Sequence, residues 1–313
     1  MYHFIVNPVS QSGKGLRLWQ NKIEPELKKQ NIEHSVEFSK ERGDVTNIVT
    51  RISSQSKNEK NCIIVILGGD GTVNDAVQGM KDFDNTTLAY IPTGSSNDFA
   101  RDLKFPKDVK KNLQRILKAK EPVLMDIGQV ETERGTRRFA VSSGIGFDGA
   151  VCQKSVHSIL KKRLNKIGLG KLTYLGIALN QIINAPKVDA QVKFSDGTEL
   201  QLKNLLFMAA MVHKYEGGGF KFCPKADAYD GELDFICASN KTIPGILVAL
   251  PTAFFGFHTI FKGIEIYRFK AAEVKTSIPL WLHTDGEVGY KAQYLDFSTF
   301  EKKLKFILYM KLQ

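Results

Sequence analysis

The sequence predicts an α/β domain followed by an all-β domain, and three observations support this prediction. Over the first third of the chain, runs typical of strands alternate with apolar stripes at helical spacing. From about residue 126, short strand-like segments follow one another with few helices between them. Three of the early strands end in loops rich in glycine and hydroxyl side chains. We therefore expect a three-layer α/β domain and then a β-sandwich.

Four strands and their helices are expected in the first domain. The runs HFIVN, IEHSVEF, CIIVIL and TLAYIP have the length and composition of short strands. A helical stripe follows each run, and Val45, Ile48, Val49 and Ile52 illustrate it at positions i, i+3, i+4 and i+7. Strands and helices that alternate in this order form a parallel sheet with helices on both faces.

Strand-like segments dominate the second domain. An Asp196-Gly197 pair between two of them is typical of a tight hairpin turn. The expected domains are therefore residues 1–126 and residues 127–300, and the pattern leaves open where the C-terminal segment 301–313 lies. The strand-like segments are VLMDIGQVE, RRFAVSSGI, VDAQVKF, ELQLKNLLFMAAMV, ELDFICAS, AEVKTS and PLWLHTDGE.

One apolar stretch, residues 243–261, is long enough to cross a bilayer. It contains Pro244, Pro251 and His258 and lies between strand-like segments, so we expect a buried or membrane-facing helix instead of a span. The chain begins with MYHFIVNP, which lacks the features of a signal peptide. Its four cysteines show no metal-ligand spacing and fit buried thiols in a reducing cytoplasm.

The formal net charge of +11 and the pI near 9.3 favour partners rich in phosphate. Basic residues are dense in KKRLNK, residues 161–166, next to the apolar run LTYLGIAL. This segment is expected either as a solvated helix face or as a surface that rests on anionic lipid. No recognition motif accompanies the basic charge, so we expect no nucleic-acid partner.

Three glycine-containing loops, NPVSQSGKG, GGDGTVND and PTGSSNDFAR, follow the first, third and fourth expected strands. Because ligands bind at the carboxyl ends of parallel strands, the three loops should share one rim of the sheet. Glycine lets the backbone approach a ligand closely, and a helix N-terminus adds a partial positive charge that suits phosphate. The rim therefore predicts a polyphosphate site, with a charge from Lys14 and hydroxyl donors from Ser10, Ser12, Thr72, Thr93, Ser95 and Ser96.

Asp70 lies among the glycines of the second loop, where a carboxylate would repel phosphate. A divalent cation between the two removes the repulsion, so Asp70 predicts Mg²⁺ that is bound directly or through water. The segment SQSGKG lacks the first glycine and the final Ser or Thr of a P-loop. The absence of G-x-G-x-x-G after the first strand disfavours a Rossmann dinucleotide site.

The chain resembles the diacylglycerol kinase catalytic-domain family, in its bacterial soluble lipid kinase branch. The resemblance rests on NPVSQSGKG, GGDGTVNDAVQG, PTGSSNDFARDL, GIGFDGAV, DAYDGELDF and HTDGE, which extend from residue 7 to residue 287. GGDGT is also similar to segments of NAD kinases and phosphofructokinases, whereas TGSSNDFAR followed by the two late motifs is more specific. The family implies a nucleotide-binding α/β domain, a β-sandwich domain, an active site in the cleft and a C-terminal segment that returns to the first domain.

The resemblance also implies an activity, the Mg²⁺-dependent transfer of the γ-phosphoryl group of ATP to a lipid hydroxyl. Diacylglycerol is the expected acceptor and phosphatidic acid the expected product. By resemblance, Glu287 is the proton acceptor, Asp285 lies beside it in the same turn, and Asp70 acts in the triphosphate loop. Asp98 and Asp126 match members of a water and magnesium network that includes Asp70. His283, in the same HTDGE motif, is expected to be structural.

Further residues are assigned to ligands by the same resemblance. Asp227, Asp230 and Glu232 match a second, structural Mg²⁺ site, in which residues 227 and 232 can contribute backbone carbonyls. Gln11 stands where many family members have glycine. The residues expected to contact the nucleotide are Asn7, Ser10, Ser12, Gly13, Lys14, Ser39, Gly69, Gly71, Thr72, Asn74, Thr93 and Ser95.

Two other functions remain open from the sequence: a kinase of a soluble metabolite, of the NAD kinase type, and a non-catalytic regulator that binds nucleotide or lipid. The lipid kinase interpretation makes the protein cytoplasmic and peripherally attached to an anionic membrane surface. The segments 161–166, 243–261 and GGGF at 217–220 are its expected lipid-side features, although the three glycines also fit a plain turn. A homodimer is left open.

Overall fold

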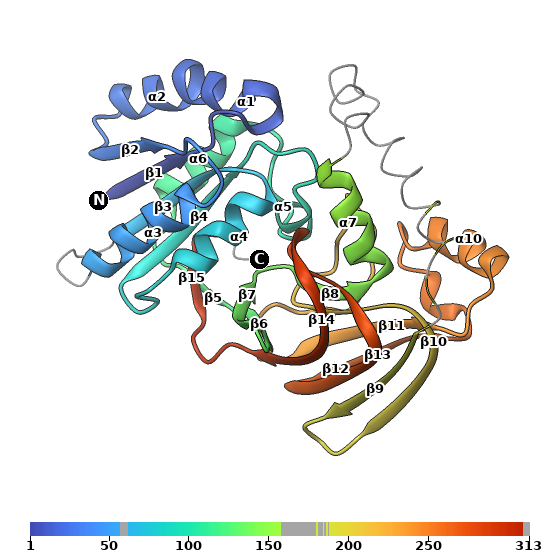
Figure 1. The fold of residues 1–313 in the computed structure, drawn as a ribbon. Helices are drawn as coiled ribbons and strands as arrows, with labels where there is room; N and C mark the ends of the chain where they lie inside the picture. Colours follow the sequence, from blue (N-terminus) through green and yellow to red (C-terminus); the bar gives the residue numbers. More distant parts are fainter. Residues whose placement is uncertain (57–61, 158–179, 181–183, 185, 187, 309–313) are drawn as a thin grey trace. The chain divides into compact units, whose positions relative to one another are not determined.

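The computed structural model of the protein describes residues 1–56, 62–157, 180, 184, 186 and 188–308. The chain divides into two compact units (Figure 1). Unit 1 comprises residues 1–127 and the chain from residue 301 onward, and unit 2 comprises residues 128–300. Unit 1 is an α/β domain and unit 2 is rich in β-strands, which confirms the predicted fold class.

Unit 1 is built on a six-stranded sheet with the order β2-β1-β3-β4-β15-β5. The first five strands of this order are parallel to their neighbours, and β5 pairs antiparallel with β15. The strands are β1 (Tyr2–Val6), β2 (His34–Phe38), β3 (Cys62–Gly68), β4 (Thr86–Pro92), β5 (Val123–Met125) and β15 (Leu304–Phe306).

Helices cover both faces of this sheet, as the alternating pattern predicts. On one face, Trp19, Ile23 and Leu27 pack with Leu113 and with inward-facing residues of β1, β3 and β4. Figure 1 shows α3 and α4 on the opposite face. The helical segments are α1 (Ser10–Leu18), the π-helical turn η1 (Trp19–Ile23), α2 (Glu24–Lys29), α3 (Asp44–Gln55), α4 (Asp70–Gly79), α5 (Asp98–Asp102) and α6 (Val109–Lys118).

The C-terminal strand β15 completes the sheet of unit 1. It lies between β4 and β5, where Phe306 pairs with Leu88 on one side and Leu304 with Met125 on the other. Phe306 is fully buried, and its ring meets Phe99 edge-on with 5.2 Å between the centroids. The segment VLMDIGQVE, expected as one strand, forms β5 of unit 1 and then β6 of unit 2.

Unit 2 contains a nine-stranded sheet whose main order is β12-β11-β10-β8-β13-β14-β6-β7, and β9 pairs with both β10 and β13. All of its strand pairs are antiparallel. The strands are β6 (Gly128–Thr132), β7 (Gly135–Phe139), β8 (Ser142–Gly146), β9 (Val188–Phe194), β10 (Glu199–Met211), β11 (Leu233–Ser239), β12 (Ile264–Phe269), β13 (Ala271–Thr284) and β14 (Glu287–Thr299).

In the described part of unit 2, two helices and a short 3-10 turn accompany this sheet. They are α7 (Phe147–His157), α10 (Ile243–Thr252) and η3 (His258–Ile260). The apolar stretch 243–261 thus forms a helix of 10 residues and a turn. Within the part of the chain that the structure describes, no helix is long and apolar enough to span a membrane. The basic run 161–166 lies outside the described residues.

Candidate functional site

The carboxyl ends of β1, β3 and β4 form one edge of the unit 1 sheet, and the three predicted loops begin there. The N–H of Asn7 donates to the carbonyl of Leu67 at 2.9 Å. The N–H groups of Thr93 and Gly94 donate to the carbonyl of Gly68 at 2.7 and 3.1 Å. These bonds continue the strand pairing into the loops, so the loops leave the sheet side by side.

Two glycines bring the second and third loops into contact. A Cβ atom on Gly94 would lie 2.5 Å from the Cα of Gly69, and one on Gly69 would lie 3.3 Å from the Cα of Gly94. Before them, a Cβ on Gly68 would lie 2.1 Å from the Thr72 hydroxyl oxygen. Because real Cβ contacts do not become this short, a side chain at Gly94 would push the two loops apart, and one at Gly68 would displace Thr72.

Several of the predicted hydroxyl donors bind the loops to one another. The hydroxyls of Ser10 and Thr93 lie 2.9 Å apart and join the first loop to the third. The Thr72 hydroxyl accepts the N–H of Gly69 at 3.3 Å and lies 3.5 Å from the side-chain nitrogen of Asn7. Thr72 and Thr93 are buried, so these two side chains stabilise the edge rather than present a free surface.

The first loop turns its backbone through three left-handed residues, Gln11, Ser12 and Gly13, with φ of 46, 56 and 85°. Successive N–H groups in such a turn can point toward one anion. Glycine favours this conformation most strongly, yet Gln11 and Ser12 adopt it here. Lys14 follows and is exposed, whereas a Cβ on Gly15 would lie 2.2 Å from the carbonyl oxygen of Asn7.

Sequence reasoning missed Tyr90, which orders the third loop from inside the sheet. Its hydroxyl lies 3.2 Å from the carbonyl of Gly68 and 3.1 Å from the Asn97 side-chain oxygen. The Asn97 amide donates in turn to the carbonyl of Gly94 at 2.8 Å. Burial raises the pKa of Tyr90 well above its usual value, and the charge of Asp70 raises it further, so the phenol remains a donor. A tyrosine within an otherwise aliphatic strand was the available signal.

Asp70 begins α4 and caps the short helix α5 of the neighbouring loop. Its two carboxylate oxygens accept the N–H groups of Asp98 and Phe99 at 3.0 and 3.2 Å. Each carboxylate oxygen has about two acceptor sites, so an oxygen can accept an N–H group and contact a cation at the same time. The structure also brings Ser39 to this edge, because its N–H donates to the carbonyl of Val6 at 3.0 Å, while Asn74 is buried in α4.

The other two carboxylates of the expected magnesium network have basic partners. Asp98 lies 3.4 Å from the guanidinium of Arg101. The buried carboxylate of Asp126 pairs with the ammonium of Lys303, which precedes β15. Over the described ranges, Asp70, Asp98 and Asp126 do not form a cluster of three ligand atoms within 4.8 Å of one another.

The turn that contains Asp227, Asp230 and Glu232 uses its carboxylates locally. The Asp227 side chain accepts the N–H of Tyr229 at 3.1 Å, and the Asp230 side chain accepts the N–H of Glu232 at 3.0 Å. Asp230 also pairs with Arg268 at 3.2 Å. The three side chains do not form a metal-binding cluster in the described structure, so a cation here would depend on backbone carbonyls.

The HTDGE turn joins β13 to β14 in unit 2 and separates its two carboxylates. Asp285, with φ of 51°, accepts the N–H groups of Ala140, Val141 and Ser142 at 2.8, 2.7 and 2.9 Å. Those three residues are buried. Asp285 therefore fastens the turn to the start of β8, while Glu287 is partly exposed at the first position of β14.

His283 lies under this turn between two carboxylates that sequence reasoning did not assign. Its Nε2 atom is 2.9 Å from Asp148 and 3.3 Å from Glu216. Burial alone would lower the pKa of His283, but Glu216 and Asp148 outweigh it and raise the pKa to about 9. The Gly286 N–H, 3.4 Å from Nδ1, would suit a neutral ring, but this long contact is weaker than two adjacent carboxylates.

This histidine cluster is the group in the described residues whose three ligand atoms lie close enough to hold a metal ion. Asp148 comes from the motif GIGFDGAV and lies in the first turn of α7. Glu216 is held by the GGGF segment, because its N–H and carbonyl pair with Phe220 at 2.9 and 3.1 Å. The three glycines between them have φ of 68, 89 and 117°, so the segment is a tight turn.

Comparisons with known proteins match both units. The sequence model of the family described as diacylglycerol kinase catalytic domain matches residues 1–130. That of the YegS C-terminal NAD kinase beta sandwich-like domain matches residues 142–294. The chain is 28% identical over 234 residues to the diacylglycerol kinase of Bacillus subtilis, and the aligned residues cover 72% of this chain and 71% of that protein. It is 26% identical over 291 residues to the diacylglycerol kinase of Staphylococcus aureus, with coverages of 92% and 86%.

Solved structures share the fold. A crystal structure of a diacylglycerol kinase from Bacillus anthracis gives a TM-score of 0.73 at 19% identity and covers 100% of this chain and 98% of that chain. An NAD kinase from Archaeoglobus fulgidus in complex with ATP gives 0.54 at 14% identity, with coverages of 98% and 93%. Residues 1–130 of this chain therefore belong to the diacylglycerol kinase catalytic-domain family, and residues 142–294 to the family of the YegS C-terminal NAD kinase beta sandwich-like domain.

Proposed function

We propose that this protein is an ATP-dependent lipid kinase that transfers the γ-phosphoryl group of ATP to the hydroxyl of diacylglycerol, which yields phosphatidic acid. The observation that carries the proposal is the close approach of Gly69 and Gly94. It brings two loops together at the N-terminus of α4, where the first N–H groups of the helix suit a triphosphate. The relatives named diacylglycerol kinase support a lipid acceptor.

In this proposal the edge of the unit 1 sheet holds the nucleotide. The left-handed turn at Gln11–Gly13 and the start of α4 supply N–H donors, and Lys14 and Ser95 supply exposed polar side chains. The bond between Ser10 and Thr93 keeps the two outer loops in register. Phosphoryl transfer depends mainly on such positioning and on charge stabilisation, because the protein forms no covalent bond to the phosphate.

Asp70 fits a magnesium ion that accompanies ATP. Two backbone N–H groups orient its carboxylate, and a carboxylate oxygen can accept a hydrogen bond and contact a cation together. When bound, the ion would offset the negative charge of the triphosphate. Asp126 fits this role less well, since the ammonium of Lys303 already balances its charge.

Glu287 of unit 2 is the proposed proton acceptor. As the lipid hydroxyl oxygen forms its bond to the γ-phosphorus, the bond from that phosphorus to the β–γ bridging oxygen breaks and ADP leaves with the electron pair. Glu287 takes the hydroxyl proton during this step, a contribution of roughly 10²–10⁴-fold in rate. Asp285 has a positioning role in the same turn, because its oxygens accept three backbone N–H groups.

The proposal is tested with ATP labelled in the γ-phosphate, Mg²⁺ and mixed micelles that contain diacylglycerol, followed by identification of the labelled product. Labelled phosphatidic acid is expected from the wild type and not from Glu287→Gln, and Asp70→Asn should be strongly impaired. Equal label from all three proteins would contradict the assignment of the site. Label on NAD but on no lipid would support a soluble-metabolite kinase, and nucleotide binding without any transfer would support a regulator.

A further inference from the structure

Unit 2 exposes a concentrated group of large apolar side chains around α10. Fourteen large hydrophobic side chains are exposed among the described residues, and seven of these lie between residues 243 and 260. Single exposed apolar residues are ordinary, but a cluster of this kind marks an interaction site. We name it the α10 apolar surface, and its members are Ile243, Leu247, Val248, Phe254, Phe255, Phe257 and Ile260.

The packing of α10 and of the turn after it keeps these side chains exposed to solvent. The opposite side of α10 is buried through Ile246 and Ala249. After the helix, the buried His258 lies 3.0 Å from the carbonyl of Phe222, and Gly256, with φ of 77°, turns the chain. Phe255, on this turn, remains 71% exposed. The exposure is therefore a product of the packing and not of a frayed helix end.

The cavity beneath α10 is too small to be the binding site of a lipid chain. A cavity of about 40 Å³ lies between α10, β10 and β11, with an almost wholly apolar lining that includes Phe207, Ile246 and Ala253. A single water needs roughly 10–15 Å³ of such volume, so the cavity has room for a few atoms and not for an acyl chain. The partner of the α10 apolar surface must therefore approach from outside.

Positive charge borders this surface. Lys241 and Lys262 enclose the stretch, and the sequence between them contains no Asp or Glu. The Lys241 ammonium donates to the carbonyl of Lys262 and lies 5.9 Å from the ring centroid of Phe261. The N–H of Lys221 donates to the carbonyl of Ala253 at 2.8 Å, which brings a third lysine alongside. An apolar centre with a basic border is typical of surfaces that lie on anionic lipid.

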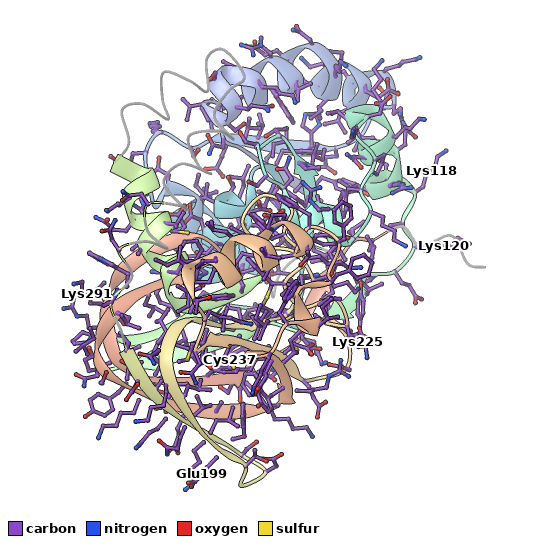
Figure 2. The ribbon with its side chains drawn as sticks, turned by 90° about the vertical axis from the view of Figure 1, so that its right-hand side faces the viewer. Lys118, Lys120, Glu199, Lys225, Cys237 and Lys291 are labelled. Carbon is purple, nitrogen blue, oxygen red and sulfur yellow. The ribbon has the colours of Figure 1, made fainter. Side chains whose placement is uncertain are left out.

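We propose that the α10 apolar surface docks the protein on a membrane of anionic phospholipid, with its aromatic side chains between the lipids and its lysines at the headgroups. This inference rests on the proposed function, in which the acceptor is a lipid. Figure 2 looks onto this side of unit 2, with α10 toward the viewer. The 10 residues of α10 span about 15 Å, half of a hydrocarbon core, so the helix lies along the membrane and does not cross it.

A second copy of the chain suits the surface less well than a membrane does. A symmetric dimer through the α10 apolar surface would bring the lysines of both copies to one interface, with no acidic residue of the stretch 241–262 to pair with them. Protein interfaces are moreover depleted in lysine at their centres. Anionic headgroups supply the missing negative charge.

Co-sedimentation with vesicles tests the proposal without any chemistry. Wild-type protein should bind vesicles of phosphatidylcholine with phosphatidylglycerol more tightly than vesicles of phosphatidylcholine alone. Phe255→Ser combined with Phe257→Ser should weaken binding about 100-fold, from about tenfold for each buried aromatic ring. The matched control is Ile278→Ser combined with Tyr294→Ser, which removes exposed apolar side chains elsewhere in unit 2 and should bind like the wild type.

The charge border is tested by Lys241→Glu combined with Lys262→Glu, which should abolish the preference for phosphatidylglycerol. Equal vesicle binding by the wild type and the Phe255/Phe257 variant would overturn the proposal, as would the absence of binding to either vesicle. A loss of dimer in sedimentation velocity, with vesicle binding unchanged, would assign the surface to contacts between copies and overturn it too.

A soluble substrate separates this inference from the proposed function. A short-chain diacylglycerol below its micellar concentration should be phosphorylated at the same rate by the wild type and the Phe255/Phe257 variant. Long-chain diacylglycerol in anionic vesicles should be phosphorylated more slowly by the variant. If vesicle binding depends on the two phenylalanines and neither lipid is labelled, the docking surface stands and the kinase proposal fails. If the variant labels both lipids at wild-type rates, the kinase proposal stands and the docking surface is contradicted.

Discussion

Two carboxylates in the HTDGE turn should respond in opposite ways to the same chemical change. Replacing Asp285 or Glu287 by its amide keeps the size of the side chain and removes one charge. Asp285→Asn should lower stability, because the carboxylate accepts three backbone N–H groups. Glu287→Gln should leave stability within about 0.5 kcal/mol of the wild type, since it is partly exposed, and should remove most of the activity.

The size of the effect at Asp285 follows from its geometry. One oxygen accepts the N–H groups of Val141 and Ser142, and the other accepts that of Ala140. If the amide oxygen of asparagine keeps the first pair, the amide nitrogen must face the N–H of Ala140, a donor against a donor. The loss of one hydrogen bond to a charged group costs about 2 kcal/mol in free energy of unfolding. Asp285→Ala leaves all three buried N–H groups without this acceptor and should cost about 4 kcal/mol.

The assay combines thermal unfolding with transfer of label from ATP to diacylglycerol. For a unit of this size, about 2 kcal/mol corresponds to a decrease in Tm of roughly 4–8 °C. We expect this decrease in Asp285→Asn, with substantial activity retained at low temperature, and an unchanged Tm with activity lost in Glu287→Gln. An Asp285→Asn variant that is as stable as the wild type and as inactive as Glu287→Gln would refute the reasoning and make Asp285 a catalytic residue.

Three further predictions concern contacts within unit 1 and contacts within unit 2. Gly94→Ala should weaken ATP binding at least tenfold in titration calorimetry, because the new Cβ would lie 2.5 Å from the Cα of Gly69. The control Gly289→Ala has open space around the new Cβ and should bind ATP normally. Lys303→Met removes the partner of the buried Asp126 carboxylate and should lower the free energy of unfolding, measured in urea, by about 3 kcal/mol. The control Lys302→Met breaks an exposed pair with Asp84 and should change this free energy by less than about 0.5 kcal/mol. Because the pKa of His283 is raised to about 9, its contribution to stability is complete below pH 6.5 and is lost as the pH rises to 9. This decline should flatten in His283→Gln, and equal slopes for the two proteins would contradict the charge on the ring.

The fold class could be predicted from periodicity, and the exceptions have a physical origin. Alternating strands and helical stripes determine which face of each element is buried, so the unit 1 sheet and its helices follow the prediction. The position of β15 in the sheet, between β4 and β5, could not be predicted from periodicity. The strand has only three residues, and so short a segment carries almost no periodic signal. The apolar stretch 243–261 was expected as a buried or membrane-facing helix, and which of its side chains are exposed depends on how α10 packs.

For the candidate site too, the features that depend on local sequence pattern could be predicted, and those that depend on long-range contacts could not. Glycine-rich loops after strands predicted the edge of the sheet, because topology alone brings the carboxyl ends of parallel strands together. The contacts of Asp70 with α5 and of Asp126 with Lys303 could not be predicted, since they join residues distant in sequence. The cluster of Asp148, Glu216 and His283 likewise unites three separate motifs.

The measurement that tests the central claim most directly is a crystal structure with a non-hydrolysable ATP analogue and Mg²⁺. The account predicts the triphosphate at the backbone N–H groups that begin α4, between the loops of Ser10 and Thr93, with the cation on Asp70 or on a water bound to it. A nucleotide located elsewhere on the protein, or at this edge with Asp70 directed away from it, would contradict the account.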